Sequence, residues 1–207
     1  MFTEGRVEVD GIRARYLEAG QGIPLVHFGA DLSTPSPAHD LLARRFRVIA
    51  LETLPQGRPG SEAAATIGRV VESLGLSDVD LMATADASAP ALWFALQQPE
   101  RVRALVLEAP TALGRDGSAP REAELERRLP EMTTPTLVVF GTADRAAAQD
   151  TGRTYTTLIP NSHLVFVYDA AAAIGRDRPE AFAELVADFL ERHEAFIISR
   201  TPTVIHP

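Results

Sequence analysis

Short continuous apolar runs alternate with longer segments of helical spacing along most of the chain. A strand that is buried on both faces of a sheet has such an uninterrupted apolar run, whereas a helix that covers a sheet repeats its apolar residues with helical periodicity. The pattern predicts buried strands at residues 23–28, 47–51, 79–83, 102–107, 136–140 and 164–168, and helices at 36–46, 61–76, 88–97 and 179–193. This alternation predicts a parallel sheet with helices on both faces.

The N-terminal segment has a different pattern. Residues 8–16 alternate between apolar and polar around the pair Asp10-Gly11, which predicts a β-hairpin. The predicted fold class is therefore α/β, with a doubly wound, mostly parallel sheet and an antiparallel hairpin at its N-terminal edge. No linker or composition shift divides the chain, so residues 1–207 are predicted to form a single domain.

The composition narrows the classes of function. The 207 residues carry 20 Lys or Arg against 28 Asp or Glu, and a formal net charge of −8 argues against nucleic acid as a partner. Because the chain has no cysteine, disulfides, thiolate catalysis and Cys-based metal sites are excluded. The first residues lack a signal-peptide pattern, and no apolar stretch approaches the ~20 residues of a membrane helix. We therefore expect a cytoplasmic protein without membrane contact.

Four segments resemble the α/β-hydrolase superfamily, and together they cover nearly the whole chain. The segment LGLSDVDLMATADASAPALWFALQQPERVRALVL (74–107) resembles the region of the nucleophile elbow, and PTLVVFGTADR (135–145) resembles the strand and loop of the catalytic acid. IPNSHLVFVYDAAAAIGRDRPEAFAELVADFL (159–190) resembles the last strand, the histidine loop and the final helix. RFRVIALETLPQGRPGS (45–61) resembles an early strand and its loop. The resemblance implies the α/β-hydrolase fold, while function depends on the residues of the site.

The resemblance also locates the nucleophile elbow. In this superfamily a serine occupies G-x-S-x-G between a strand and a helix, where small neighbours allow a strained turn. Both the upstream LGL and the downstream Pro-Glu place Ala85 at the nucleophile position, within the motif Ala83–Ala87. A shift by one residue would make Asp86 the elbow residue, as in relatives with an aspartate nucleophile, but it breaks both spacings. Ser88, in the first turn of the next helix, is expected to cap that helix.

The general base of the resemblance is a histidine in the loop after the last strand. Matching VYDAAAAIGRDRPEAF to that loop places Ala172 at the base position. No histidine is expected to replace it, because His163 is expected before the last strand and roughly 17 Å away. The remaining histidines are expected on outer helices, in the tail and in an early strand: His39, His193, His206 and His27. His27 is expected to be a hydrogen-bonded core residue near the cleft.

The catalytic acid is the triad member that the sequence retains. Asp144 in GTADR matches this acid, whose task is to orient and stabilise a histidine. Because the histidine is missing, a second interpretation stays equally open, in which Asp144 caps a helix that starts near Arg145. Glu108, at the end of a predicted strand, can reach the cleft but is expected to be solvated.

The resemblance implies an oxyanion hole made of two backbone N–H groups. One is that of Asp86, and the other is that of Ala30, which follows Phe28-Gly29. Backbone donors survive the loss of side chains, so an anion-binding hole can remain. The carboxylate of Asp86 would repel an anionic intermediate there, which argues against ester hydrolysis.

The substrate-covering cap of the superfamily is predicted to be reduced or absent. Relatives usually insert a helical cap between the sixth strand and the acid strand. Here residues 108–134 are a short, polar and charged stretch with one predicted helix at 121–128. We expect this stretch to be a remnant of the cap region.

These features predict a pseudo-hydrolase that has lost serine-hydrolase activity and binds a small molecule in the vestigial cleft, or another protein. Assembly into a homo-oligomer is also expected. Loss of triad members leaves at most ~10³–10⁴-fold catalysis over water. Two alternatives stay open: a hydrolase or lyase with carboxylate chemistry, and weak hydrolysis through a water held by Asp86 or Asp144. The carboxylates considered for the first alternative are Asp86, Asp144, Glu108 and Asp169. No cofactor and no metal are expected, since no ligand spacing is present.

Overall fold

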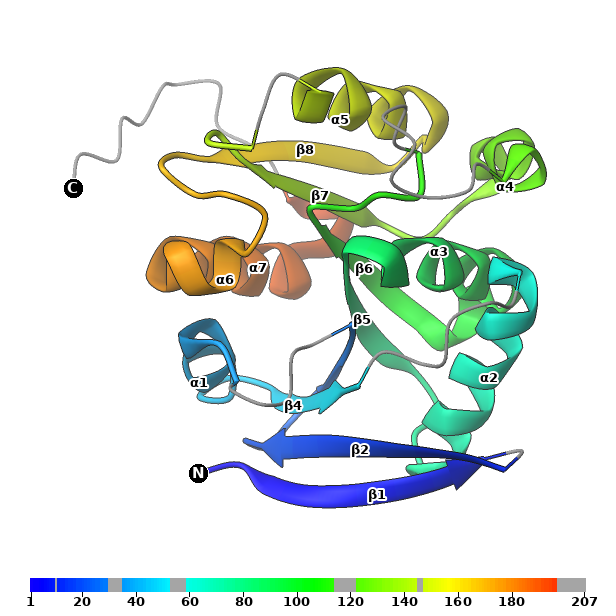
Figure 1. The fold of residues 1–207 in the computed structure, drawn as a ribbon, viewed down its shortest axis with the longest axis vertical. Coiled ribbons are helices and arrows are strands. Elements are labelled where there is room, and N and C mark those ends of the chain that lie inside the picture. Colours follow the sequence, from blue (N-terminus) through cyan, green and yellow to red (C-terminus); the bar gives the residue numbers. More distant parts are fainter. Residues whose placement is uncertain (10, 30–34, 53–58, 114–121, 145–146, 197–207) are drawn as a thin grey trace.

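The computed structural model describes residues 1–9, 11–29, 35–52, 59–113, 122–144 and 147–196. The strands of this part are β1 (Thr3–Val9), β2 (Ile12–Ala19), β3 (Pro24–Phe28), β4 (Arg47–Leu51), β5 (Val79–Thr84), β6 (Val102–Glu108), β7 (Thr136–Gly141) and β8 (Ser162–Val167). They form one eight-stranded sheet in the order β1-β2-β4-β3-β5-β6-β7-β8. The pairs β1/β2 and β2/β4 are antiparallel and all other neighbours are parallel. Figure 1 shows the β1–β2 hairpin at one edge and β8 at the other.

Helices cover both faces of the sheet (Figure 1). One face packs against α2 (Gly60–Ser73), α3 (Ser88–Gln97), α4 (Ala123–Arg128) and α5 (Ala147–Leu158). The opposite face packs against α1 (Pro37–Leu42), α6 (Ile174–Asp177) and α7 (Pro179–Arg192). Short 3₁₀ turns are η1 (Ala85–Ala87), η2 (Pro99–Arg101), η3 (Leu129–Glu131) and η4 (His193–Ala195). The two layers explain why the central strands are apolar on both faces.

The alternation of side chains along β5 decides where its polar residues point. Leu81 and Ala83 belong to the apolar cluster with α2 and α3. Met82 belongs to the cluster with α1, α6 and α7. Because side chains of a strand alternate between faces, Asp80 and Thr84 share the face of Met82.

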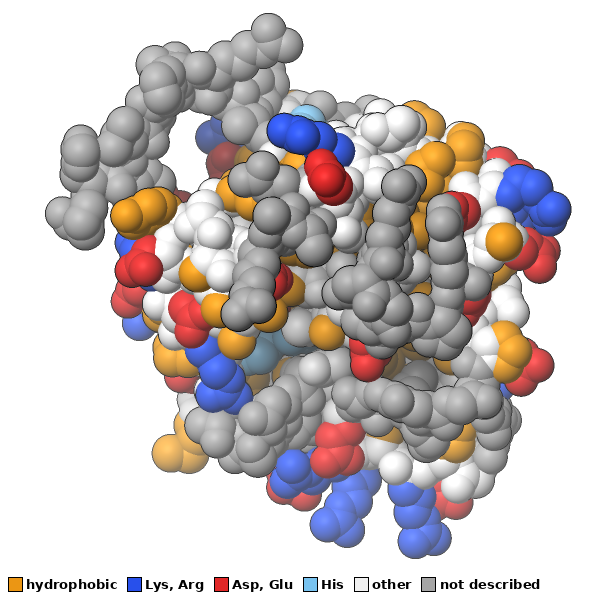
Figure 2. Space-filling model, turned by 45° about the horizontal axis from the view of Figure 1, so that its top comes forward, with side chains coloured by type: hydrophobic (Ala, Val, Ile, Leu, Met, Phe, Trp, Pro, Cys, Tyr) orange, Lys and Arg blue, Asp and Glu red, His pale blue; other side chains and the backbone are white. Residues whose placement is uncertain are grey.

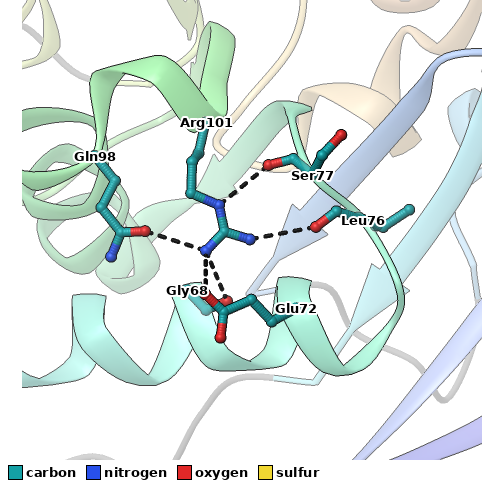
Figure 3. A network of polar contacts seen from close by, with 6 residues as sticks. All are labelled: Gly68, Glu72, Leu76, Ser77, Gln98 and Arg101. Carbon is teal, nitrogen blue, oxygen red and sulfur yellow. Dashed lines mark hydrogen bonds and ion pairs between the residues drawn. The ribbon is translucent and has the colours of Figure 1, made fainter.

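Arg101 fastens the end of α2 to the turn that leads into β6 (Figure 3). Its guanidinium donates hydrogen bonds of 2.7–3.5 Å to the backbone carbonyls of Gly68, Leu76 and Ser77 and to the side chains of Glu72 and Gln98. The carbonyls of Leu76 and Ser77 belong to the turn between α2 and β5, which has no helical or sheet hydrogen-bond partners of its own at these positions. These hydrogen bonds join the turn that leads into β6 to α2 and to the turn that leads into β5.

These elements confirm the predicted α/β fold class, including the antiparallel N-terminal pair. The last strand differs from the prediction, because it begins at Ser162 instead of residue 164. His163 therefore lies within β8 rather than before it, and its ring contacts those of Phe189 and Phe196. The connection from β6 to β7 contains α4 and η3, while residues 114–121 lie outside the described part. The single domain and the reduced cap stay predictions.

None of the described helices is both long and apolar enough to cross a membrane.

Candidate functional site

The turn between β5 and α3 has a strained backbone at its first residue. Ala85 has a φ of 49°, in the left-handed region that costs a residue with a Cβ roughly 1–2 kcal/mol. A strand, a sharp turn and a helix in this order are the geometry of a nucleophile elbow. The structure thus places Ala85 at the tip of such a turn, where its side chain is a methyl group.

Ser88 holds the elbow in place from the start of α3. Its hydroxyl donates to the Ala85 carbonyl at 2.6 Å and accepts from the backbone N–H groups of Thr111 at 3.3 Å and Ala112 at 3.1 Å. The prediction that Ser88 caps α3 is wrong, since no side chain caps this helix. The hydroxyl instead ties the elbow to the segment that follows β6.

The positions that the resemblance gives to the acid and the base lie on adjoining loops. The loop of Asp144 follows β7 and that of Ala172 follows β8, and Ala143 N–H donates to the Ala170 carbonyl at 2.9 Å between them. Asp144 is half-buried, whereas Ala172 is exposed. Residues 145–146 lie outside the described part, so the capping role of Asp144 stays a prediction.

The candidate carboxylates near the elbow have other partners. Asp86 is exposed and accepts a hydrogen bond of 3.0 Å from the Thr111 hydroxyl. Asp169, also exposed, lies 3.8 Å from the guanidinium of Arg178. Among the hydrogen bonds and ion pairs of the described residues, none joins Asp86 to Asp144. The described contacts of Asp86 and Asp169 are thus with a hydroxyl and a guanidinium, and the carboxylate mechanism stays an alternative.

The end of β3 approaches the elbow closely. Gly29 has a φ of 85°, and a Cβ there would lie 2.9 Å from the Thr84 carbonyl oxygen and 3.0 Å from the Ala87 Cβ. Only glycine fits this contact, because both the backbone angle and the distance exclude a side chain. Ala30 lies outside the described residues, so the oxyanion hole of Ala30 and Asp86 stays a prediction.

A chain of buried and partly buried hydrogen bonds runs beside the elbow, on the face covered by α1, α6 and α7. Ser36, which precedes α1, has its Oγ 3.0 Å from Nδ1 of His39. His39 Nε2 lies 2.8 Å from His27 Nδ1, and His27 Nε2 lies 2.7 Å from the Thr84 hydroxyl. The Thr84 hydroxyl donates to Glu108 Oε2 at 3.0 Å. We call these five side chains the Ser36–Glu108 network.

The backbone of Ser36 sets the direction of every proton in this network. The Ser36 N–H donates to His39 Nδ1 at 3.1 Å, and because an amide N–H can only donate, Nδ1 carries no proton. A neutral His39 then donates from Nε2 to His27 Nδ1. His27 in turn donates from Nε2 to Thr84, whose hydroxyl donates to Glu108. Each of the three links from His39 to Glu108 thus has one donor and one acceptor, and all three point toward the carboxylate.

Glu108 ends the network in a buried position. It is only 5% exposed, and its Oε1 accepts a hydrogen bond of 2.8 Å from the Gly175 N–H at the start of α6. The expectation that Glu108 is solvated is therefore wrong. His27 is buried and hydrogen-bonded through both ring nitrogens, as expected. His39, expected on an outer helix away from the chemistry, is buried against it.

Burial keeps both histidines neutral. Burial lowers the pKa of His27 well below its usual value, and the charge of His39 when protonated lowers it further. Burial lowers the pKa of His39 to about 4, with the positive charge of Arg176 adding to this and Asp40 opposing it. Burial raises the pKa of Glu108, although its hydrogen bonds from Gly175 and Thr84 oppose the rise. Burial thus favours the neutral form of all three groups.

A cavity of about 140 Å³ opens onto this network. It is lined by His27, Gly29, Ser36, His39, Thr84, Glu108, Ala173, Gly175 and Arg176. Figure 2 shows histidine atoms in a recess of the surface. Ligands of open α/β sheets bind at the carboxyl ends of the strands, and this cavity lies there, at the ends of β3, β5 and β6. Among the described residues no group of three His, Asp or Glu side chains is placed to hold a metal ion.

Several solved hydrolase structures superpose on this chain. Carboxylesterase CesB of Bacillus subtilis superposes with a TM-score of 0.77 at 16% identity, covering 92% of this chain and 92% of that chain. Naproxen esterase of Bacillus subtilis gives a TM-score of 0.76 at 15% identity over 91% of both chains. A predicted CIB-like hydrolase of Thermoplasma acidophilum gives 0.74 at 18% identity, covering 92% of this chain and 98% of that one. The chain therefore has the α/β-hydrolase fold.

Sequence comparison gives a partial match. A segment of 72 residues is 32% identical to the uncharacterised hydrolase YugF of Bacillus subtilis strain 168 and covers 34% of this chain. That segment spans about a quarter, 26%, of the length of YugF. No family model matches the chain.

Sequence reasoning did not find the Ser36–Glu108 network as a unit. Its members lie in four elements that are far apart in the chain, so no local spacing reveals them. One signal was present in Ser36-Pro37-Ala38-His39, where a serine N-cap is followed by a polar residue at the third helical position. In a capping box that residue reaches back to the N-cap backbone, which here turns His39 inward.

Proposed function

We propose that the protein has lost the serine-hydrolase chemistry of the elbow and binds a small molecule in its cleft, as a pseudo-hydrolase of the α/β-hydrolase superfamily. One observation carries this proposal: the elbow turn is built at Ala85, with a φ of 49°, around a side chain that has no nucleophilic atom. The exposed Ala172, at the base position, supports it because its side chain cannot accept a proton.

The cavity beside the elbow supports a binding role. Ligand sites are concave and combine apolar walls with a few convergent polar groups. Here the polar lining residues are Ser36, His27, His39, Thr84, Glu108 and Arg176. Such a lining favours a small ligand that has hydrogen-bonding groups.

Hydrolysis of p-nitrophenyl acetate and butyrate tests the loss of elbow chemistry. We expect the native protein to show no steady-state turnover above buffer. The double substitution Ala85→Ser with Ala172→His restores a nucleophile and a base beside Asp144, and it should raise steady-state turnover at least tenfold. A triad member typically contributes several orders of magnitude, so tenfold is a cautious threshold.

The alternative is a hydrolase or lyase with carboxylate chemistry centred on Asp144 and Asp86. The substitution Asp144→Asn distinguishes it, because this change preserves shape and removes the charge. Native turnover that disappears in Asp144→Asn would contradict the pseudo-hydrolase proposal. Native turnover that persists in this variant would come from another group.

A further inference from the structure

The strand β8 directs a row of backbone hydrogen-bonding groups away from the sheet. It is the last strand in the order of the described sheet, and its one neighbour there is β7 (Figure 1). The Thr142 N–H, just after β7, donates to the Val167 carbonyl, so the backbone of Val167 faces β7. Successive residues of a strand face opposite sides, so every second residue of β8 faces away from β7. These outward-facing residues are Ser162, Leu164 and Phe166.

The apolar side chains of β8 are incompletely covered. Leu164 and Phe166 pack against the apolar cluster on one face of the sheet and Val165 against the cluster on the other. All three are only partly buried, whereas Val138 and Val139 of β7 are fully buried. The difference follows from the sheet, because β7 has a strand on each side and β8 on one side. A further strand beside β8 would continue both apolar layers.

The distribution of charge distinguishes this edge from the opposite edge of the sheet. The strand β1 carries the exposed Glu4, Arg6 and Glu8, and charged side chains on an edge strand oppose its pairing with another chain. Residues 159–168, which contain β8, have no Lys, Arg, Asp or Glu. Tyr168, directly after β8, is 73% exposed. The β8 edge therefore lacks the protection that the β1 edge has, and it suits an uncharged strand as its partner.

A second copy of β8 is such an uncharged strand. Two copies related by a two-fold axis would pair antiparallel, so that the same patch is used on both. One register gives all three outward-facing residues a partner within β8. It places Leu164 opposite Leu164 of the second copy, and Ser162 opposite Phe166. Each such pair exchanges two backbone hydrogen bonds, so the pairing supplies about six.

We infer that the edge of β8 is the surface through which two copies of this chain associate, as an antiparallel β8–β8 pair that joins their sheets. This inference goes beyond the proposed function of the cleft, because it identifies an interaction surface and its partner. The symmetric pair satisfies the outward-facing backbone groups of both copies at once. It also leaves the two charged β1 edges at the far ends of the joined sheet.

Sedimentation equilibrium of the full chain over a series of concentrations tests the association. We expect the mass to reach twice that of one chain as the concentration rises. Ser162→Lys adds a charge that pairing would place beside the apolar side chains of the second copy, so it should raise the dissociation constant of the dimer by about tenfold or more. Thr3→Lys is the matched control, because it adds the same charge at an exposed residue of the β1 edge. It should leave the dissociation constant unchanged.

Disulfide cross-linking tests the register. The chain has no cysteine, so a single substitution introduces one thiol at a known position. In the proposed pair the two copies of residue 164 have Cα atoms about 5.5 Å apart, which a disulfide can span. We expect Leu164→Cys to give a covalent dimer on oxidation with Cu(II)–phenanthroline, as seen by non-reducing electrophoresis. Tyr168→Cys is the control, because its two copies would lie about 26 Å apart, eight residues along the strand.

Three outcomes would overturn the inference. The mass of a single chain at every concentration would show that another segment or another protein uses this edge. A dimer that Ser162→Lys leaves unchanged would associate through a different surface. A dimer of folded Leu164→Cys that forms no disulfide, with folding checked by circular dichroism, would exclude the proposed pairing. None of these measurements involves the cleft, so their outcome is independent of the proposed loss of hydrolase chemistry.

Discussion

Two buried polar clusters lie on the same face of the sheet, at opposite ends of β5. The side chains of one are hydrogen-bonded to each other, whereas the carboxyl group of the other has no hydrogen-bond partner among the described residues. Thr84 belongs to the Ser36–Glu108 network, in which the successive side-chain hydrogen bonds measure 2.7–3.0 Å. Asp80 lies four residues earlier, about 13 Å away at ~3.3 Å per residue. Its Oδ1 lies 3.5 Å from Arg103 Nε and 3.8 Å from His193 Nε2. Within the described residues, neither oxygen of Asp80 has a hydrogen-bond partner.

Burial raises the pKa of the carboxyl group in both clusters, and what differs between them is the hydrogen bonding. Burial raises the pKa of Asp80 to about 7, while Arg103 opposes this and Asp78 adds to it. Burial also raises the pKa of Glu108, but two directed donors, Gly175 N–H and the Thr84 hydroxyl, favour its ionised form. A carboxylate with fixed donors can accept a proton from a defined direction. This property makes the network, and not the Asp80 cluster, a candidate site for proton transfer.

Removal of the Glu108 carboxylate should have the largest effect on stability. Glu108→Ala leaves the Gly175 N–H and the Thr84 hydroxyl without their acceptor, and each buried unsatisfied group costs about 1–3 kcal/mol. With the cavity that the change creates, we expect a loss of about 4 kcal/mol in the free energy of unfolding. Urea denaturation at pH 7 measures it.

The matched control is Glu108→Gln, whose amide oxygen can still accept from Gly175. We expect this variant to lose only about 1 kcal/mol, because one donor keeps its partner. Equal losses in the alanine and glutamine variants would show that the carboxylate, rather than hydrogen bonding, stabilises this region.

The contrast also explains what could be predicted from the sequence. The strands and helices follow from periodicity, which is a local property, and the order of buried runs was sufficient for the fold class. The position of Ala85 followed from local anchors in the segment 74–107. Local patterns of this kind survive because each segment must bury its own apolar face.

The buried polar network could not be predicted in the same way. His27, Thr84 and Glu108 each look unremarkable in their own strands, and only the parallel register of β3, β5 and β6 brings them together. Glu108 was expected to be solvated because an isolated carboxylate at a strand end usually is. The covering by α6 depends on contacts between residues 67 positions apart, such as Glu108 with Gly175. Residue spacing contains no record of such a contact.

Asp80→Asn should alter how stability depends on pH. The folded pKa of Asp80 is raised from 3.8 to about 7, so the native state binds the proton more tightly than the unfolded chain. Native Asp80 therefore contributes stability that is fully present below pH 4 and is lost as the pH rises through about 7. This loss is about 4 kcal/mol, because the shift is about three pKa units at roughly 1.4 kcal/mol per unit. The variant should not show it.

The measurement compares the free energies of unfolding of the native protein and Asp80→Asn at pH 4 and pH 8. From pH 4 to pH 8, the free energy of unfolding of the variant should rise relative to that of the native protein by about 3 kcal/mol. Asp78→Asn, at a half-buried neighbour, is the control and should shift the profile by less than about 1 kcal/mol. A constant difference between Asp80→Asn and the native protein would show that Asp80 titrates normally.

His39 should give the smallest of these effects, with the opposite sign. Its folded pKa is lowered from 6.5 to about 4, so the unfolded chain binds the proton more tightly than the native state. The stability that neutral His39 contributes is present above pH 6.5 and is lost as the pH falls through about 4. The groups that face His39 are Ser36 and Asp40 beside it, His27 on β3 and Arg176 on α6. In His39→Gln the loss between pH 6.5 and 4 should be smaller by about 2–3 kcal/mol.

The comparison of both variants separates the two clusters. Asp80→Asn should change the profile up to about pH 7, whereas His39→Gln should change its acid limb below pH 6.5, where His27 still titrates in the variant. Denaturation curves from pH 4 to pH 8 measure both. If His39→Gln retained the full acid loss, His27 or another group would be responsible for it. In that case protonation of the network at acidic pH would begin at His27 and not at His39.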